Sequence, residues 1–213
     1  MTEAIVSAFV TLFVIVDPIA VAPIFIALTK NNSDAERRAM AIKAVAIATV
    51  TLVIFALVGE IFLKSLGITL AAFRIAGGVL LFILAIEMVF AHQSGIRTTT
   101  SGEEEEAITK KDVSVFPLGI PLIADPGAMA SMILLIGERP GDVISQLVVI
   151  LVLLAVLAVL ALSLLMLLVA ARIVKYLGVT GVNVISRVFG IVLGALAAQY
   201  ILDGIRQSFP ALA

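Results

Sequence analysis

The sequence predicts an all-α integral membrane protein whose six transmembrane helices form a 3+3 inverted-topology repeat, with helices one and four discontinuous. Three observations predict this fold. First, 62% of the 213 residues are hydrophobic and only 14% are charged, whereas soluble domains are roughly 45–50% apolar and about 25% charged. Second, six stretches each stay apolar over about 20 residues, the length at which a helix crosses a bilayer. Third, motifs of the first half of the chain recur in the second half.

The same composition excludes several classes of function. A soluble enzyme or a nucleic-acid-binding domain of this size could not bury so much apolar surface. The chain has no cysteine and a single histidine, His92, so iron–sulfur clusters and zinc sites lack their ligands. No Gly-x-Ser-x-Gly motif or dense carboxylate cluster occurs within the apolar stretches, and such a feature would be needed for an integral-membrane enzyme. We therefore expect no metal, no cofactor, no nucleic-acid partner and no enzymatic activity.

Charged connections separate the six predicted spans in order. Lys30, Arg37 and Arg38 follow the first span, Lys64 follows the second, and a long polar stretch follows the third. Apolar runs such as residues 148–154 do not alternate with polar residues, which favours helices. The first span is not expected to be a cleaved signal peptide, because its start is acidic and Asp17 interrupts it. The predicted spans are residues 4–28, 40–63, 68–90, 115–136, 143–169 and 179–202.

Basic residues predict the orientation of these spans. Nine lie in the connections after helices one, three and five, and three lie on the opposite side. Since cytoplasmic loops are enriched in Lys and Arg, we expect those three loops to be cytoplasmic and both termini to lie outside an inner cell membrane. The nine are Lys30, Arg37, Arg38, Lys43, Arg97, Lys110, Lys111, Arg172 and Lys175.

The longest polar stretch, residues 91–114, divides the chain into repeats over residues 1–90 and 115–213. It contains four consecutive glutamates followed by Lys110 and Lys111. A regulatory acidic loop is the alternative, but like-charge runs repel and rarely fold, so we interpret it as a cytoplasmic linker.

Two sequence matches relate the two halves. The run Ile-Val-Asp-Pro-Ile-Ala around Asp17 resembles Ile-Ala-Asp-Pro-Gly-Ala around Asp125, 108 residues later. The run that begins at Arg74 resembles the run that begins at Arg187, 113 residues later. Because each repeat has three helices, the second enters the membrane from the opposite face, an architecture typical of secondary transporters. The small residues Gly77-Gly78 and Gly190 with Gly194 predict close helix packing.

Prolines interrupt the first and fourth spans. Pro18 and Pro23 lie near the middle of the first span, and Pro117, Pro121 and Pro126 punctuate the fourth. A proline inside a helix costs about 3 kcal/mol or more, and unwound backbone in a membrane needs cover from protein or from a water-filled cavity. We therefore expect both breaks to line one internal cavity near the midplane.

The charged residues inside the spans have two interpretations each. Asp17 and Asp125 either cap the half-helices that begin at the following prolines, or take a proton or cation while the helix N-termini bind an anionic group. Arg74 and Arg187 occupy matching positions in spans three and six. They either neutralise the aspartates or bind a carboxylate, or they extend to the membrane surface.

These motifs resemble the MarC family of inner-membrane proteins, which includes the SnatA-type neutral amino acid transporters. The resemblance rests on Asp17-Pro18-Ile19 with Pro23-Ile24-Phe25, and on Pro117-Leu118 to Pro121-Leu122 followed by Pro126-Gly127-Ala128, and it covers essentially the whole chain. It implies a proton-coupled secondary transporter of small neutral amino acids such as glycine or alanine, with the substrate between broken helices one and four. An exporter of another small metabolite or drug by the same mechanism is the alternative. The implied substrate-binding residues are Asp17, Pro18, Ala20, Val21, Pro23, Asp125, Pro126, Gly127 and Ala128.

The chain departs from the family pattern at two places. The family usually has Gly-Asn where this chain has Ala20-Val21, and Gly where this chain has Asp125. The expected site is thus less polar on one side and more acidic on the other, which leaves room for a more cationic or more hydrophobic substrate.

Overall fold

The computed structural model of the chain describes residues 2–90, 112–137 and 143–209, and every regular element in these ranges is helical. The predicted linker at residues 91–114 lies outside the described residues except for its last three. The elements are α1 (Thr2–Val16), α2 (Pro18–Leu28), α3 (Asp34–Ser65), α4 (Leu70–Phe90), the π-helical segment η1 (Ser114–Ile123), α6 (Pro126–Ile136), α7 (Val143–Leu168) and α8 (Ala170–Ser208).

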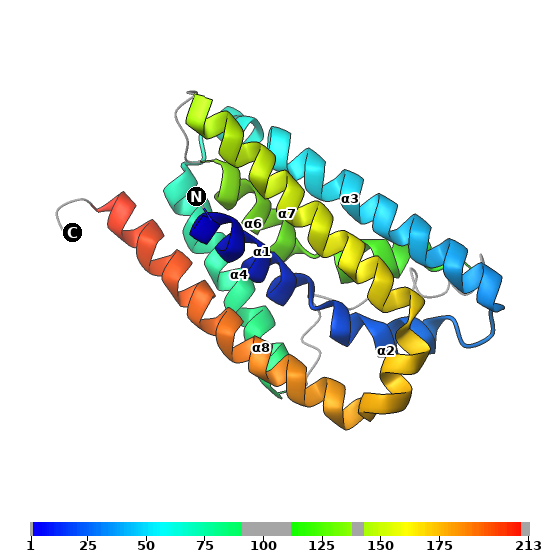
Figure 1. Ribbon diagram of the computed structural model, residues 1–213. Helices are drawn as coiled ribbons and strands as arrows, with labels where there is room; N and C mark the ends of the chain where they lie inside the picture. Colours follow the sequence, from blue (N-terminus) through cyan, green and yellow to red (C-terminus); the bar gives the residue numbers. More distant parts are fainter. Residues whose placement is uncertain (1, 91–111, 138–142, 210–213) are drawn as a thin grey trace.

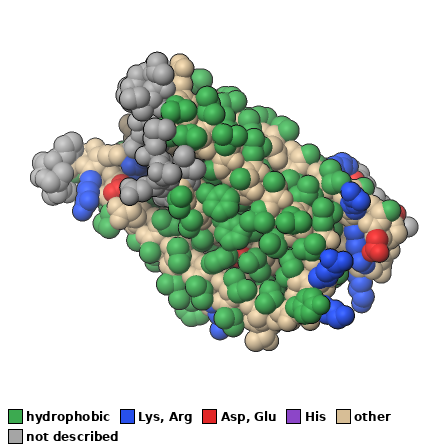
Figure 2. Space-filling view, viewed as in Figure 1, with side chains coloured by type: hydrophobic (Ala, Val, Ile, Leu, Met, Phe, Trp, Pro, Cys, Tyr) green, Lys and Arg blue, Asp and Glu red, His purple; other side chains and the backbone are tan. Residues whose placement is uncertain are grey.

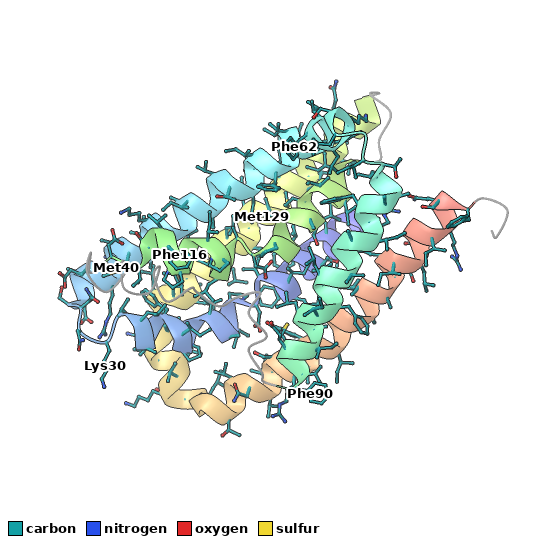
Figure 3. All side chains as sticks on the ribbon, turned by 180° about the vertical axis from the view of Figure 1, so that it is seen from behind. Lys30, Met40, Phe62, Phe90, Phe116 and Met129 are labelled. Carbon is teal, nitrogen blue, oxygen red and sulfur yellow. The ribbon has the colours of Figure 1, made fainter. Side chains whose placement is uncertain are left out.

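The helices form a bundle with its two interrupted stretches inside. Figure 1 shows α3 and α7 along one side and α4 and α8 along the other, with α1, α2 and α6 between them. Figure 3, seen from behind, shows Phe116, in η1, and Met129, in α6, on the near side of the bundle. Asp17 and Asp125 themselves are fully buried between the helices.

The described part of the chain contains enough apolar helix to cross a bilayer five or six times. Five helical stretches are long and apolar enough to cross a membrane, namely Ala8–Leu28, Asp34–Ser65, Leu70–Phe90, Gln146–Leu168 and Thr180–Ser208. The pair formed by η1 and α6, bent by 54°, makes a sixth if it crosses as one span. Large apolar side chains such as Ile61, Ile150 and Ile191 are exposed, and apolar side chains cover most of the face seen in Figure 2. This surface suits lipid rather than water.

Two helices begin earlier than hydropathy predicts. α3 begins at Asp34 instead of residue 40, because Ser33 and Glu36 form a capping box in which the Ser33 N–H donates to Glu36 Oε2 at 2.8 Å. α8 begins at Ala170 instead of residue 179, with a kink at Gly178, whose φ is 63°. Both additions contain charged residues, so a search for continuous apolar residues does not detect them.

α4 and α8 lie antiparallel and approach backbone to backbone. A Cβ added at Gly78 would lie 2.9 Å from the Ala197 carbonyl oxygen, and one at Gly190 would lie 3.0 Å from the Ala85 carbonyl oxygen. A Cβ at Gly204 would lie 2.8 Å from the Ala71 carbonyl oxygen. Helices in lipid associate through such small-residue contacts, because apolar side chains gain little by leaving lipid for protein.

Candidate functional site

Asp17 separates α1 from α2 and is fully buried. Its backbone is left-handed, with φ 41° and ψ 64°, a conformation that Asp adopts more readily than most residues. Pro18 cannot donate a hydrogen bond and disfavours helical geometry at the residue before it. The chain therefore leaves the α1 helix at Asp17 and starts α2 at Pro18. Asp17 Oδ1 accepts a hydrogen bond from Ala20 N at 3.3 Å.

Asp125 plays the same structural part at the start of α6. It is fully buried and extended, with φ −79° and ψ 163°. Its Oδ1 accepts a hydrogen bond from Ala128 N at 2.6 Å, and its carbonyl oxygen accepts one from Met129 N at 3.0 Å. Both aspartates thus cap a helix of 11 residues that begins with proline. The capping interaction that the sequence suggested is present at both positions.

The two interrupted stretches meet at one small internal gap, which is too tight to admit a water molecule. Val16 and Pro18 flank Asp17, and Ile123 stands two residues before Asp125. The backbone breaks of the two halves are therefore neighbours in the interior, although the sequence separates them by more than 100 residues. The lining residues are Val16, Pro18, Val21, Ile123, Ser163 and Leu167.

The other expected binding residues are distributed around this gap. Val21 is buried at its wall, while Ala20 and Pro23 on the same helix are half-buried and do not line it. In α6, Ala128 is buried and Pro126 is half-buried. Gly127 packs onto α4, since a Cβ there would lie 2.7 Å from Leu81 Cδ2 and 3.2 Å from Asp125 Oδ1. Of the nine expected binding residues, only Pro18 and Val21 line the gap, and none of the four from the second half does.

Neither membrane arginine lines the gap. Arg74 is half-buried in the first turns of α4, and Arg187 is exposed on α8. Exposure of Arg187 fits a side chain that extends to the membrane surface. Glu87, farther along α4, is only 7% exposed.

Sequence reasoning missed the serines that the fold places in the interior. Ser163 of α7 lines the gap, and its hydroxyl donates to the Val159 carbonyl oxygen at 2.9 Å. Ser131 of α6 is fully buried, and its hydroxyl has no hydrogen-bond partner among the residues that the structure describes. The signal in the sequence was a single serine within a long apolar run. Because a buried hydroxyl without a hydrogen-bond partner costs free energy, a serine at such a position indicates a special role.

A larger cavity of about 570 Å³ lies where α2 and α7 end and where α3 and α8 begin. Its apolar wall includes Phe25 and Leu167, and Leu167 also lines the internal gap. Leu167 therefore stands between the cavity and the two helix breaks. The full lining is Phe25, Ile26, Asp34, Arg37, Arg38, Leu167, Leu168, Val169, Ala171 and Arg172.

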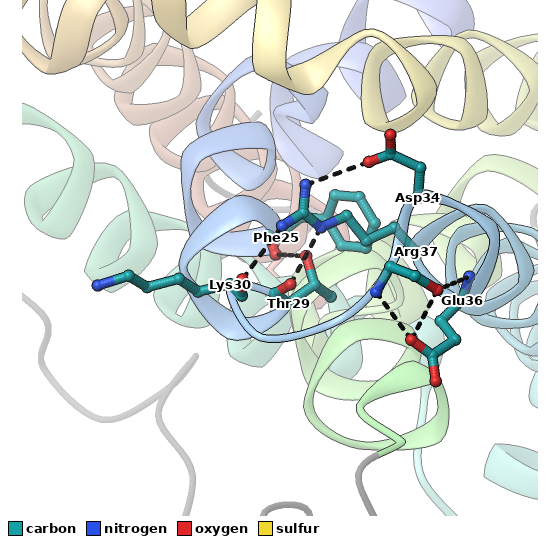
Figure 4. A network of polar contacts seen from close by, with 7 residues as sticks. Phe25, Thr29, Lys30, Asp34, Glu36 and Arg37 are labelled. Carbon is teal, nitrogen blue, oxygen red and sulfur yellow. Dashed lines mark hydrogen bonds and ion pairs between the residues drawn. The ribbon is translucent and has the colours of Figure 1, made fainter.

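Arg37 is held in place at the rim of this cavity. Its Nε donates to the Thr29 carbonyl oxygen at 3.0 Å and its Nη2 donates to the Lys30 carbonyl oxygen at 3.2 Å. Its Nη1 lies 3.5 Å from Asp34 Oδ1. Figure 4 shows this network, in which Arg37 ties the C-terminal end of α2 to the first turn of α3.

A second polar contact joins α3 to the start of the second half. Lys43 Nζ donates to Asp112 Oδ2 at 2.6 Å, and Asp112 Oδ1 accepts hydrogen bonds from Ser114 N and Oγ. The hydrogen bond from Lys43, followed by those from Ser114, lowers the pKa of Asp112 from 3.8 to about 2. Within the described residues, no group of three or more His, Cys, Asp or Glu side chains could hold a metal ion.

Comparison with known proteins assigns the chain to a family. The model of the MarC family of integral membrane proteins matches residues 2–209. A Bacillus subtilis relative named UPF0056 membrane protein YvbG is 35% identical over 212 residues, which cover 100% of this chain and 99% of the relative.

Two further relatives come from distant organisms. UPF0056 inner membrane protein YhgN of Escherichia coli is 34% identical over 95% of this chain and 96% of its own length. A UPF0056 membrane protein of Archaeoglobus fulgidus is 34% identical over 94% of this chain and 92% of its own length. No solved structure matches the chain. With the family model matched over nearly its whole length and an all-helical, multi-pass fold, the chain belongs to the MarC family of integral membrane proteins.

Proposed function

We propose that this chain is a proton-coupled secondary transporter of small neutral amino acids of the glycine or alanine type. The observation that carries the proposal is the meeting of both Asp-Pro breaks at one closed gap inside the bundle. Secondary transporters characteristically bind substrate where discontinuous helices meet near the midplane. We interpret the gap, lined by Pro18 of the first break and by Ile123 two residues before Asp125, as that site in a closed, empty form.

The chemistry at the breaks suits a zwitterion. The N-termini of α2 and α6 carry the positive ends of helix dipoles, which favour a carboxylate. Asp17 and Asp125 supply buried carboxyl groups that can accept the substrate ammonium or a proton. Pro18 and Val21 supply an apolar wall, and the gap must widen before any substrate enters, which favours a small side chain.

We further propose that the two halves are related as an inverted repeat. In α4, Gly78 lies against Ala197 and Ile201 of α8. In α8, Gly190 lies against Ala85, Met88 and Val89 of α4; it is 112 residues after Gly78, one residue from the register of the sequence match, which pairs Gly190 with Gly77. If the two halves of the chain are swapped, the contacts of Gly78 take the place of those of Gly190, and the reverse. A two-fold axis between antiparallel helices requires this exchange. Such a relation supports two similar conformations, one open to each side of the membrane.

The large cavity supports a route between the gap and one side. Phe25 and Leu167 form its inner wall, and Leu167 is shared with the gap. A small separation of α2 from α7 at these two side chains would open the gap to the cavity. We propose that this end, which carries Arg37, Arg38 and Arg172, faces the cytoplasm. A reporter fused to Ala213 should then read as external, and a cytoplasmic reading would overturn the orientation.

Transport by purified protein in liposomes tests the proposal. Uptake of radiolabelled glycine and alanine should rise when an inward proton gradient is imposed. Asparagine caps a helix as well as aspartate does, so Asp17→Asn and Asp125→Asn retain the caps while they remove the carboxyl groups. At least one variant should lose the stimulation by the gradient.

Two results would overturn parts of the proposal. Unchanged pH dependence in both asparagine variants would rule out coupling through these aspartates. Failure of folded protein to take up any neutral amino acid would reject the substrate class, and efflux of other metabolites from loaded vesicles would then support the exporter.

A further inference from the structure

We propose that the cavity at the basic end of the bundle binds the phosphate of an anionic phospholipid headgroup. This is the same cavity that we propose as the route to the closed gap, so a lipid seated in it would close that route, but the inference does not depend on what the protein transports. It rests on the charge of the cavity lining, on the apolar wall beside that charge, and on where the cavity lies along the spans.

The lining carries an excess of positive charge. Arg37, Arg38 and Arg172 contribute three cations, and Asp34 contributes the one anion. Asp34 lies beside Arg37, whose guanidinium also donates to two backbone carbonyl oxygens. Arg38 and Arg172 form no ion pair with any other described residue. These two arginines are exposed, come from different helices, α3 and α8, and line the same cavity.

Two arginines that line one cavity favour an anion with several oxygens. A planar guanidinium donates two parallel hydrogen bonds to phosphate or carboxylate. Arg38 and Arg172 can thus engage different oxygens of one phosphate, with Arg37 held beside them as a fixed third charge. Neutral lipids with a choline headgroup bring a cation of their own, which this lining would repel.

The apolar wall makes an amphiphile a better occupant than a free anion. Phe25, Ile26, Leu167, Leu168 and Val169 line the same cavity of about 570 Å³ as the arginines. α2 and α7 end at this level and α3 and α8 begin there, so the cavity lies at the predicted membrane surface. Basic pockets between transmembrane helices at this depth bind anionic headgroups. The glycerol and upper acyl carbons would cover the apolar wall, which a soluble phosphate cannot do.

Lipid binding to the full chain in nanodiscs tests this inference. The wild-type protein should melt several degrees higher in discs that contain phosphatidylglycerol than in discs of phosphatidylcholine alone. Native mass spectrometry should show retained phosphatidylglycerol on the wild type. The double variant Arg38→Gln/Arg172→Gln should lose most of the stabilisation and bind the retained lipid at least tenfold more weakly.

A matched control separates the cavity from general attraction between basic residues and anionic lipid. Lys30→Gln/Lys175→Gln removes the same charge near the same end, and neither lysine lines the cavity. This variant should behave as the wild type. Equal loss in the two double variants would overturn the proposed site, and so would retention of the full effect by Arg38→Gln/Arg172→Gln.

The source of the phosphate is tested in the same discs. Inorganic phosphate added to phosphatidylcholine discs should not raise the melting temperature of the wild type. A rise equal to that produced by phosphatidylglycerol would show a site for free anions and overturn the lipid assignment. Because every readout is binding or stability, failure here leaves the transport proposal untouched, and the reverse also holds.

Discussion

Replacing Gly190 or Gly194 with alanine should have opposite effects on stability, although both lie in α8 one turn apart. A Cβ at Gly190 would lie 2.8 Å from Met88 Cβ and 3.0 Å from the Ala85 carbonyl oxygen. Neither atom can rotate away, since one is backbone and the other is attached to it. A Cβ at Gly194 would meet its nearest neighbour, Ala85 Cβ, at 3.7 Å, an ordinary contact distance.

The magnitudes follow from two opposing terms. Replacement of glycine by alanine in a helix interior stabilises the helix by about 1 kcal/mol. Gly194→Ala should gain most of this amount. At Gly190 the new methyl group forces α4 and α8 apart, and overpacking of this kind costs about 1–3 kcal/mol. The net change for Gly190→Ala is then about 0–2 kcal/mol of destabilisation, so the two variants should differ by about 2 kcal/mol.

Thermal unfolding in mild detergent, followed by circular dichroism, measures this difference. A stability change of 1 kcal/mol shifts the melting temperature by roughly 2–4 °C for a domain of 150–250 residues. Gly194→Ala should therefore melt several degrees above Gly190→Ala, with the wild type between them or level with Gly190→Ala. If the Gly190→Ala variant were as stable as the Gly194→Ala variant, the close approach of α4 and α8 at Gly190 would be refuted.

Three further predictions concern polar contacts. Asp17→Ala should destabilise by about 1–3 kcal/mol, because alanine cannot cap α2 and is strained at a φ of 41°, whereas Asp17→Asn should melt near the wild type; equal melting of the two would contradict the cap. Because the pKa of Asp112 is lowered from 3.8 to about 2 in the folded state, its stabilising contribution is present above about pH 4 and is lost as the pH falls toward 2. Asp112→Asn should remove that part of the pH dependence of melting, and an unchanged slope would count against it. Arg37→Gln should speed amide exchange in residues 28–33 and leave α8 unchanged, and unaltered exchange in that turn would show that Arg37 does not hold it.

Local chemistry explains what could be predicted from the sequence. Long apolar runs form membrane helices because hydrocarbon offers backbone groups no other partners. Asp before Pro predicted helix starts at Pro18 and Pro126, and the observed helices begin there. Pro117 and Pro121 follow cis peptide bonds within η1, a detail that hydropathy does not encode.

The faces of the helices could not be predicted in the same way. In a soluble helix the apolar stripe identifies the buried face, but in lipid both faces are apolar. Nothing in the run of α7 marks Leu167 as a residue that faces the helix breaks, and Ser163 is marked only as the one serine in residues 146–168. The sequence also contains no sign that Gly127, an expected binding residue, lies against Leu81 of α4.

The sequence by itself determined that this protein is an integral membrane protein, about where its apolar helices lie, and that helices begin at Pro18 and Pro126 after a capping aspartate. These properties depend on residues close together in the chain, such as an apolar run or a proline after a capping aspartate. Only the tertiary structure decided that the two interruptions share one closed gap, and that Arg38 and Arg172 line one cavity. Those juxtapositions depend on close packing between helices distant in sequence, which uniformly apolar surfaces leave unspecified.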